Sequence, residues 1–135
     1  MYVSLALLAD AVNTTGDGKL NLLGVFDMIH ATVVPCHHLR MFVVVRIRAE
    51  VGEKGEPHSL GIRLRDTDGK LLDAPPEMPI LFPEADPRPY PEHTFVLEMG
   101  NIAFPAFGSY EFEVAIDGER AGAISLYVND AHQPV

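Results

Sequence analysis

The sequence predicts an all-β fold: a single-domain antiparallel β-sandwich of about eight strands, immunoglobulin-like or jelly-roll-like. Three observations predict it. Apolar and polar side chains alternate with a period of two in several segments. Gly, Pro and Asp recur between these segments at strand-length intervals, and no segment of useful length has a helical period. Two packed sheets are the simplest way to bury many strands that each have one apolar face.

The bulk composition agrees with one domain spanning residues 1–135. Hydrophobic residues make up 47% of the chain and charged residues 21%, as in ordinary globular proteins. A single cysteine cannot form an internal disulfide, which favours a reducing compartment. The opening MYVSLALLAD lacks the basic start and the cleavage site of an export signal, and no apolar run has the length of a membrane span. We therefore expect a cytoplasmic protein.

The formal net charge of −9 bears on the partners. An acidic chain repels phosphate backbones and anionic lipid surfaces. No alternation of basic and aromatic residues suits base stacking. We expect neither nucleic acid nor membrane as a partner.

The first predicted strand covers about Val3–Val12 and is apolar almost throughout. We expect it to be central in its sheet, and buried on both sides or covered by another chain. The Gly-rich segment Thr14–Lys19 connects it to the second strand.

Four later segments each have one apolar face, so we expect antiparallel sheets with one covered face. In chain order, these faces are Val43, Val45, Ile47, Ala49 and Val51; Leu60, Ile62 and Leu64; Phe95, Leu97 and Met99; and Tyr110, Phe112, Val114 and Ile116.

Turn signals separate these segments. Asp68-Gly69 and Asp117-Gly118 each lie between two strand-like runs and predict tight hairpins with positive φ at both central residues. The Pro-rich segment Pro83–His93 is a loop rather than a domain boundary. In FPAFGSYEFEV, the Gly two residues before Tyr110 resembles a tyrosine corner, in which the phenol bonds to upstream backbone.

Two segments resemble a known family. LADAVNTTGDGKLNLLGVFDMIHATVVP (Leu8–Pro35) has the form Leu-Ala-Asp, Gly-Lys-Leu, Gly-Val-Phe-Asp-x-Ile and Pro, and GSYEFEVAIDGERAGAISLYV (Gly108–Val128) is a hairpin that begins with Gly-x-Tyr. Together they resemble a family of short bacterial proteins known only as a domain of unknown function. The resemblance implies a small β-sandwich and brings no reaction, ligand, cofactor or catalytic residue.

The stretch VVPCHHLR sets the only cysteine, Cys36, beside His37 and His38, with His30 upstream. A structural zinc site needs four Cys or His ligands, commonly in spaced pairs that are missing here. Adjacent histidines on an extended chain point to opposite faces. A Cys–His nucleophile meets its base through tertiary structure, which local spacing does not show. We favour an ordinary strand entrance, with no metal site.

Four arginines form the most notable charge feature, because they make up four of ten basic residues and lie on the outward faces of two predicted strands. They are Arg46, Arg48, Arg63 and Arg65. If the two strands pair, these side chains form a basic patch that suits an anionic ligand or an acidic partner. We favour the alternative, a ladder of cross-strand ion pairs with Glu50, Glu98, Glu111 or Glu113.

Carboxylates and loop aromatics complete the candidates. DTDG (Asp66–Gly69) looks like the start of a calcium loop, but the following ligands do not match, so we interpret it as a turn. Asp10 and Asp27 follow apolar runs, where a carboxylate accepts backbone N–H bonds at a strand end.

Loop aromatics can anchor a partner or plug the end of the sandwich, and both interpretations stay open for Tyr90, Phe104 and Phe107.

The leading hypothesis is a non-enzymatic module for protein–protein contact or self-assembly, through an exposed sheet edge or the apolar first strand. The alternative is a small-ligand-binding or enzymatic sandwich that holds an anion with the four arginines. No phosphate loop, nucleophile elbow or His-Glu-x-x-His motif is present in the sequence, and we assign no catalytic residue and no cofactor.

Overall fold

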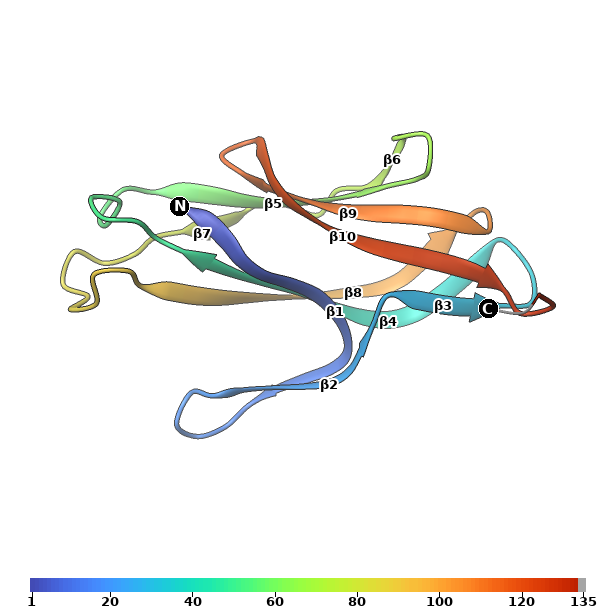
Figure 1. The fold of residues 1–135 in the computed structure, drawn as a ribbon, viewed down its shortest axis with the longest axis horizontal. Coiled ribbons are helices and arrows are strands. Elements are labelled where there is room, and N and C mark those ends of the chain that lie inside the picture. The colour runs from blue at the N-terminus through green and yellow to red at the C-terminus, as the bar shows by residue number, and fades with distance from the viewer. Residues whose placement is uncertain (134–135) are drawn as a thin grey trace.

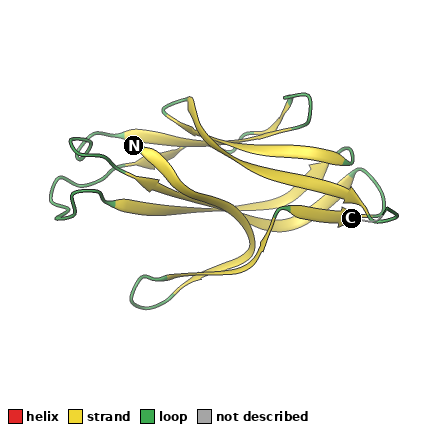
Figure 2. Cartoon of the chain, in the orientation of Figure 1, coloured by secondary structure: helices red, strands yellow, loops and turns green. Residues whose placement is uncertain are grey.

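A computed structural model of the chain describes residues 1–133 and confirms the predicted β-sandwich (Figure 1). Two sheets pack face to face, and the described residues form strands and loops without helix (Figure 2). No helix able to cross a membrane occurs among them. The strands are β1 (Tyr2–Thr14), β2 (Leu20–Phe26), β3 (Met28–Ala31), β4 (Cys36–Arg48), β5 (His58–Arg65), β6 (Leu71–Asp73), β7 (Met78–Ile80), β8 (Glu92–Phe104), β9 (Gly108–Ile116) and β10 (Glu119–Asp130).

The first sheet has the order β2-β1-β4-β8, and the second has the order β3-β10-β9-β5-β6, with β7 also paired to β5. The strands pair antiparallel, as predicted, except for the short parallel pair β3–β10. Ten strands form where about eight were expected, because β6 and β7 are three-residue strands too short to show alternation.

The core lies between the two sheets and uses the apolar faces that alternation predicted. Met41, Val43, Val45 and Ile47 of β4 are at most 1% exposed, and they belong to the same buried cluster as inward residues of β5, β9 and β10. Val51 was expected on the same face but is 73% exposed, because β4 ends at Arg48 and Val51 lies in the following turn.

Strand β4 is also covered on its outer face, which alternation did not predict. Phe42 is 8% exposed and Val44 is fully buried. The hairpin of β1 and β2 folds back beneath this face, as Figure 1 shows. We call its outer part, residues 10–24, the arm. Its tip lines a cleft of about 580 Å³ together with Arg46 and Val96 of the sheet.

The arm begins at a bend between Asp10 and Gly24. Gly24 has a φ of +67°, in the left-handed region that favours glycine. A Cβ at this position would lie 2.9 Å from the carboxyl carbon of Asp10, so a larger residue does not fit. The bend therefore needs glycine, and it lets β1 pair with β4 along its first part and with β2 along its second. The prediction that the first strand is central is confirmed. The expected burial on both sides is wrong for most of the strand, because only Leu8 and Ala9 of β1 are buried.

A second irregularity lies in β4 and β8, at Leu39 and Asn101. Asn101 has a φ of +53°, and Leu39 is 80% exposed. On one side of this point Met41 and Met99 face the core as partners, whereas on the other side the partners Cys36 and Phe104 face it. The inward face thus changes from odd to even residue numbers within both strands.

The two Asp-Gly turns differ. Asp117 and Gly118 have φ values of +54° and +83°, as expected for a two-residue hairpin turn. At the other turn only Gly69 has positive φ, and the loop is longer. Asp66 N donates to Lys70 O at 3.0 Å, and the Asp66 carboxylate accepts from the N–H groups of Asp68 and Lys70 at 2.9 Å. The prediction of a two-residue hairpin turn is wrong there, because this Asx-type arrangement closes a loop of three residues, 67–69.

Candidate functional site

The four arginines do not form one patch. The strands that carry them, β4 and β5, lie in different sheets, so the pairing on which a shared patch depended does not occur. Arg46 and Arg48 lie on the outer face of the first sheet and interact with Glu92, at 3.9 and 3.7 Å. Alternation assigns faces within one strand but does not assign strands to sheets.

Arg63 and Arg65 lie on the outer face of the second sheet, around Glu113. The carboxylate of Glu113 is 3.1 Å from Arg63, 3.6 Å from Arg65 and 3.5 Å from Arg120. Arg120 also makes two bonds of 2.7 Å to Glu111. The predicted cross-strand ion pairs with Glu111 and Glu113 are therefore present, and they join three strands.

The charges around Glu113 change its acidity. Burial works to raise the pKa of Glu113, but the hydrogen bond from Arg63 and the charges of Arg65, Arg63 and Arg120 outweigh it. The net effect holds the pKa of this carboxyl below its ordinary value. The pKa of Glu111 is also lowered, chiefly by the hydrogen bonds from Arg120. The two glutamates thus neutralise most of the charge of the three arginines.

The arginines of the first sheet border the cleft beneath the arm. Arg46 Nε donates to Thr94 Oγ1 at 3.1 Å, and Lys19 of the arm tip lines the same cleft. The guanidinium of Arg48 lies 5.2 Å above the ring centre of Tyr90. These side chains are partly neutralised by Glu92, in place of the partners Glu50 and Glu98 that the sequence suggested.

The three candidate aromatics have three different environments. Phe104 is fully buried and packs edge-on against Tyr110, with ring centres 5.0 Å apart. It is not available as an anchor for a partner, because the irregularity at Asn101 turns it toward the core. Phe107 is half-buried and packs against the core, where it helps to close the end of the sandwich. Tyr90 is 47% exposed, and of the three it alone stays available to a partner.

The Cys36 segment opens β4, as predicted. His37 is exposed, whereas His38 is half-buried and lies 5.8 Å from the ring centre of Phe26. Within residues 1–133, no group of three or more His, Cys, Asp and Glu side chains is arranged to hold a metal ion.

Asp10 and Asp27 were interpreted as acceptors of backbone N–H bonds. The hydrogen bonds of the described residues do not support this, and the Asp10 carboxylate lies against Gly24.

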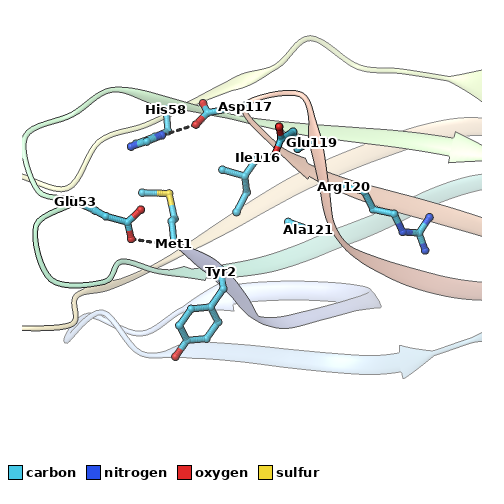
Figure 3. A pocket seen from close by; sticks show the side chains of 9 residues that line it. All are labelled: Met1, Tyr2, Glu53, His58, Ile116, Asp117, Glu119, Arg120 and Ala121. Atoms are coloured by element: carbon cyan, nitrogen blue, oxygen red, sulfur yellow. Dashed lines mark hydrogen bonds and ion pairs between the residues drawn. The ribbon is translucent and has the colours of Figure 1, made fainter.

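A cleft that the sequence analysis missed contains a His–Asp pair (Figure 3). His58 at the start of β5 lies 2.5 Å from Asp117, measured from Nδ1 to Oδ2, and this bond is the main cause that lowers the pKa of Asp117. Asp117 also accepts the N–H of Ser59 at 3.0 Å. The cleft has a volume of about 530 Å³ and is lined by Met1, Tyr2, Glu53, His58, Ile116, Asp117, Glu119, Arg120 and Ala121.

The geometry of this pair suits a structural role better than proton transfer. A general base must reach its substrate through the free ring nitrogen. Here Nε2 of His58 is buried and has no hydrogen-bond partner among the described atoms, and the nearest carboxylate oxygen, from Glu56, is 4.0 Å away. The pair instead ties the start of β5 to the β9–β10 turn, where the amide N–H of Asp117 also bonds to the carbonyl of Ser59 at 2.9 Å.

Comparison with protein families assigns the chain to a family. A model described as a family of unknown function, DUF6941, matches residues 4–129. The chain belongs to DUF6941. The resemblance seen at Leu8–Pro35 and Gly108–Val128 thus extends over nearly the whole sandwich. Comparison with curated proteins found no match.

In this DUF6941 chain, each of the two family-like segments contains residues that shape the fold. The first contains Asp10 and Gly24, which form the bend of the arm. The second contains Tyr110, whose hydroxyl donates to Ala106 O at 2.6 Å and accepts from Ala106 N at 3.0 Å, so the predicted tyrosine corner is confirmed. The second segment also contributes Asp117 to the pair with His58, and Glu111, Glu113 and Arg120 to the ion-pair cluster.

Strand β8 has a long open edge, along which its backbone N–H and C=O groups face no other strand of the described chain. This 13-residue strand pairs with β4 along one side and ends the first sheet. Within the described chain, no other strand pairs with its second side. Alternate N–H and C=O groups of such a strand point away from the sheet and can accept another strand. An exposed sheet edge was expected, but the sequence alone does not show that β8 forms it, because strand order depends on long-range pairing.

Proposed function

We propose that this DUF6941 chain is a non-enzymatic module of the bacterial cytoplasm that mediates protein–protein contact or self-assembly through a strand edge. The observation that carries the proposal is the unpaired side of β8. Exposed backbone groups on a long edge form main-chain hydrogen bonds with an added strand, a common mode of protein recognition.

The state of the polar candidates supports the same proposal. Glu111 and Glu113 form ion pairs with three arginines of neighbouring strands, and His58 is held by Asp117 with its second nitrogen buried. These groups hold strands together. The alternative, an anionic ligand bound by four converging arginines, loses its main support because the arginines lie on opposite outer faces of the sandwich.

A capture experiment tests the proposal. Tagged wild-type protein, a Val96→Lys variant and a Val25→Lys variant are each exposed to lysate of the source organism that also contains the untagged chain. Val96 lies on the β8 edge, whereas Val25 is an exposed valine on β2 and serves as the matched control. We expect wild type and Val25→Lys to retain a stoichiometric protein, which is either a partner or the untagged chain, and Val96→Lys to lose it.

The proposal is wrong if the wild-type protein retains nothing in stoichiometric amount, or if Val96→Lys retains the same protein as wild type. In the first case the fold offers no stable contact. In the second case the contact lies on another surface.

A further inference from the structure

We propose that the occupant of the β8 edge is a second copy of this chain. The two β8 strands pair antiparallel about a two-fold axis that passes between the two copies of Val96, and the two four-stranded sheets become one continuous sheet. This inference rests on the proposed function, because it names the partner at the same edge.

The symmetry limits the possible registers. A two-fold axis perpendicular to the sheet keeps the same face outward in both copies, so each outward residue faces another outward residue. The outward residues of the first part of β8 are Glu92, Thr94, Val96, Glu98 and Gly100, since they pair with the outward residues of β4. Each register therefore sets these five side chains against one another in a fixed pattern.

Only some registers keep like charges apart. Centring the axis on Phe95 sets Glu92 against Glu98 of the second copy, and centring it on Glu98 sets two Glu98 residues together. Like charges directly opposite in a sheet are destabilising. Centring it on Leu97 places Glu98 against Val96, which is 39% exposed and next to the fully buried Val44. A charge beside this apolar pair is unfavourable.

The register centred on Val96 gives complementary charges. Glu98 faces Thr94 of the second copy, whose neighbour on β4 is Arg46. Glu92 faces Gly100 of the second copy, whose neighbour on β4 is Arg40. Thr and Gly are small, so each glutamate lies beside an arginine one strand further on. The two-fold axis repeats both contacts, and four Glu–Arg pairs are added across the interface.

The arginines are already placed for these contacts. Arg40 pairs with Glu98 of its own chain at 2.7 Å, and Arg46 lies 3.9 Å from Glu92. In the paired state each arginine lies between one glutamate of its own chain and one of the second copy. The outer faces of the two sheets then carry alternating charges along the new seam.

Apolar contacts add to this register. The two copies of Val96 face each other at the centre and cover the surface that each leaves exposed. On the inward side, Phe95 faces Leu97 of the second copy, and both residues are only partly buried in one chain. Pairing therefore removes apolar surface from water on both faces of the sheet.

Sedimentation of the purified chain tests the pairing. At about 0.15 M salt the Debye length is about 8 Å, which limits repulsion between two chains of net charge −9. We expect a species of twice the 14.8 kDa of one chain at high micromolar concentration. Val96→Lys and Glu98→Lys should each raise the dissociation constant at least tenfold, while Val25→Lys leaves it unchanged. Circular dichroism verifies that all variants fold.

Cysteine cross-linking tests the register. In a Cys36→Ser background, Val96→Cys should form a covalent dimer under mild oxidation, because directly opposite residues lie within the 4.4–6.8 Å Cα separation that a disulfide spans. Thr94→Cys alone and Glu98→Cys alone should not cross-link. A mixture of these two variants should, because the proposed register sets them opposite each other.

The outcomes separate this inference from the proposed function. A monomer at all concentrations overturns the pairing of two copies, and if Val96→Lys still abolishes capture of a different protein from lysate, the edge serves a heterologous partner instead. A dimer that Val96→Lys and Glu98→Lys do not weaken, or one that cross-links through Leu97→Cys instead of Val96→Cys, also overturns the proposed interface.

Discussion

The phenol oxygen of Tyr110 makes two hydrogen bonds to the backbone of Ala106, one as donor and one as acceptor. Its ring is 5% exposed and packs against Phe104. The spacing of Pro105, Gly108 and Tyr110 revealed this contact in the sequence, since a tyrosine corner is local in the chain. A local pattern of this kind is predictable without knowing the rest of the fold.

Tyr110→Phe should lower the free energy of unfolding by about 1–2 kcal/mol, because the ring still packs but two backbone groups lose their partner. Urea denaturation followed by circular dichroism measures this change. Tyr127→Phe is the control, since Tyr127 is 43% exposed and its hydroxyl makes no hydrogen bond to another described residue. Equal stability of the two variants would show that the Tyr110 hydroxyl contributes nothing.

Several carboxyl groups have a pKa below their ordinary value in the folded chain. Hydrogen bonds from Arg88 lower the pKa of Asp86 to about 2 from 3.8, and the arginine cluster lowers the pKa of Glu113 from 4.5. A carboxyl with a lowered folded-state pKa stabilises the fold fully above its unfolded value, and this contribution is lost as the pH falls through the folded value. Stability should thus be flat from pH 7 to about pH 5 and fall between about pH 5 and pH 2.

Glu113→Gln should lower the free energy of unfolding by about 1–3 kcal/mol at pH 7, because three arginines lose the charge of their shared partner. The difference from wild type should shrink as the pH falls through the lowered pKa of Glu113, because the wild-type carboxyl then becomes protonated. Thermal melts from pH 3 to 7 measure both effects. Glu119→Gln, at an exposed residue, should leave the melting temperature at each pH unchanged. A constant difference at every pH would contradict the proposed charge interaction.

The arm is the element that most distinguishes this sandwich. It crosses the outer face of the first sheet, so β4 is covered on both sides near Val44. The alternation of β4 predicted its inward face correctly, but the buried outer residues Phe42 and Val44 depend on a hairpin that folds back from β1. That fold-back depends on the close contact of Asp10 and Gly24. Both residues can be read from the sequence, but the pairing of β1 with β2 that brings them together cannot.

Gly24→Ala should cost about 1–3 kcal/mol, because a left-handed φ strains an L-residue and the new Cβ meets Asp10. Chemical denaturation measures the loss. Adding Asp10→Ala removes the carboxylate atoms that the new Cβ meets, but keeps the Cβ of residue 10 and the backbone strain, so the double variant should recover part of the stability and not all of it. Full recovery would show that the backbone conformation costs nothing.

Strand assignment explains what else could not be predicted. The four arginines, the β8 edge and the His58–Asp117 pair all depend on which strands are neighbours, and each involves residues more than 40 positions apart in the chain or strands of different sheets. Alternation gives the face of a residue within its own strand. Strand order follows from the packing of the whole chain, which is why Phe104 was assigned to a loop and the four arginines were considered for one shared patch.

The whole molecule has one core shared by both sheets. Buried residues of β1, β4, β8, β5, β9 and β10 form a single cluster. A domain of this size with one core commonly unfolds in one cooperative step. The two sheets are therefore parts of one folding unit rather than two.

Urea unfolding followed by far-ultraviolet circular dichroism and by tyrosine fluorescence should give coincident curves. Phe104→Ala should move both curves equally and lower the free energy of unfolding by about 3–5 kcal/mol, because it leaves a cavity at a fully buried position between the sheets. Leu81→Ala, at a side chain that is 60% exposed, should change it by less than about 0.5 kcal/mol. Two separated transitions would contradict a shared core.

The two-sided burial of β4 has a consequence for the exchange of amide protons with solvent. Strands that are paired on both edges and covered on both faces open only when the whole domain unfolds, whereas edge strands open through small local fluctuations. The amides from Val43 to Ile47 should therefore be the slowest to exchange with deuterium, and their protection should report the global free energy of unfolding. The amides at the arm tip, from Thr15 to Lys19, should exchange within the first seconds.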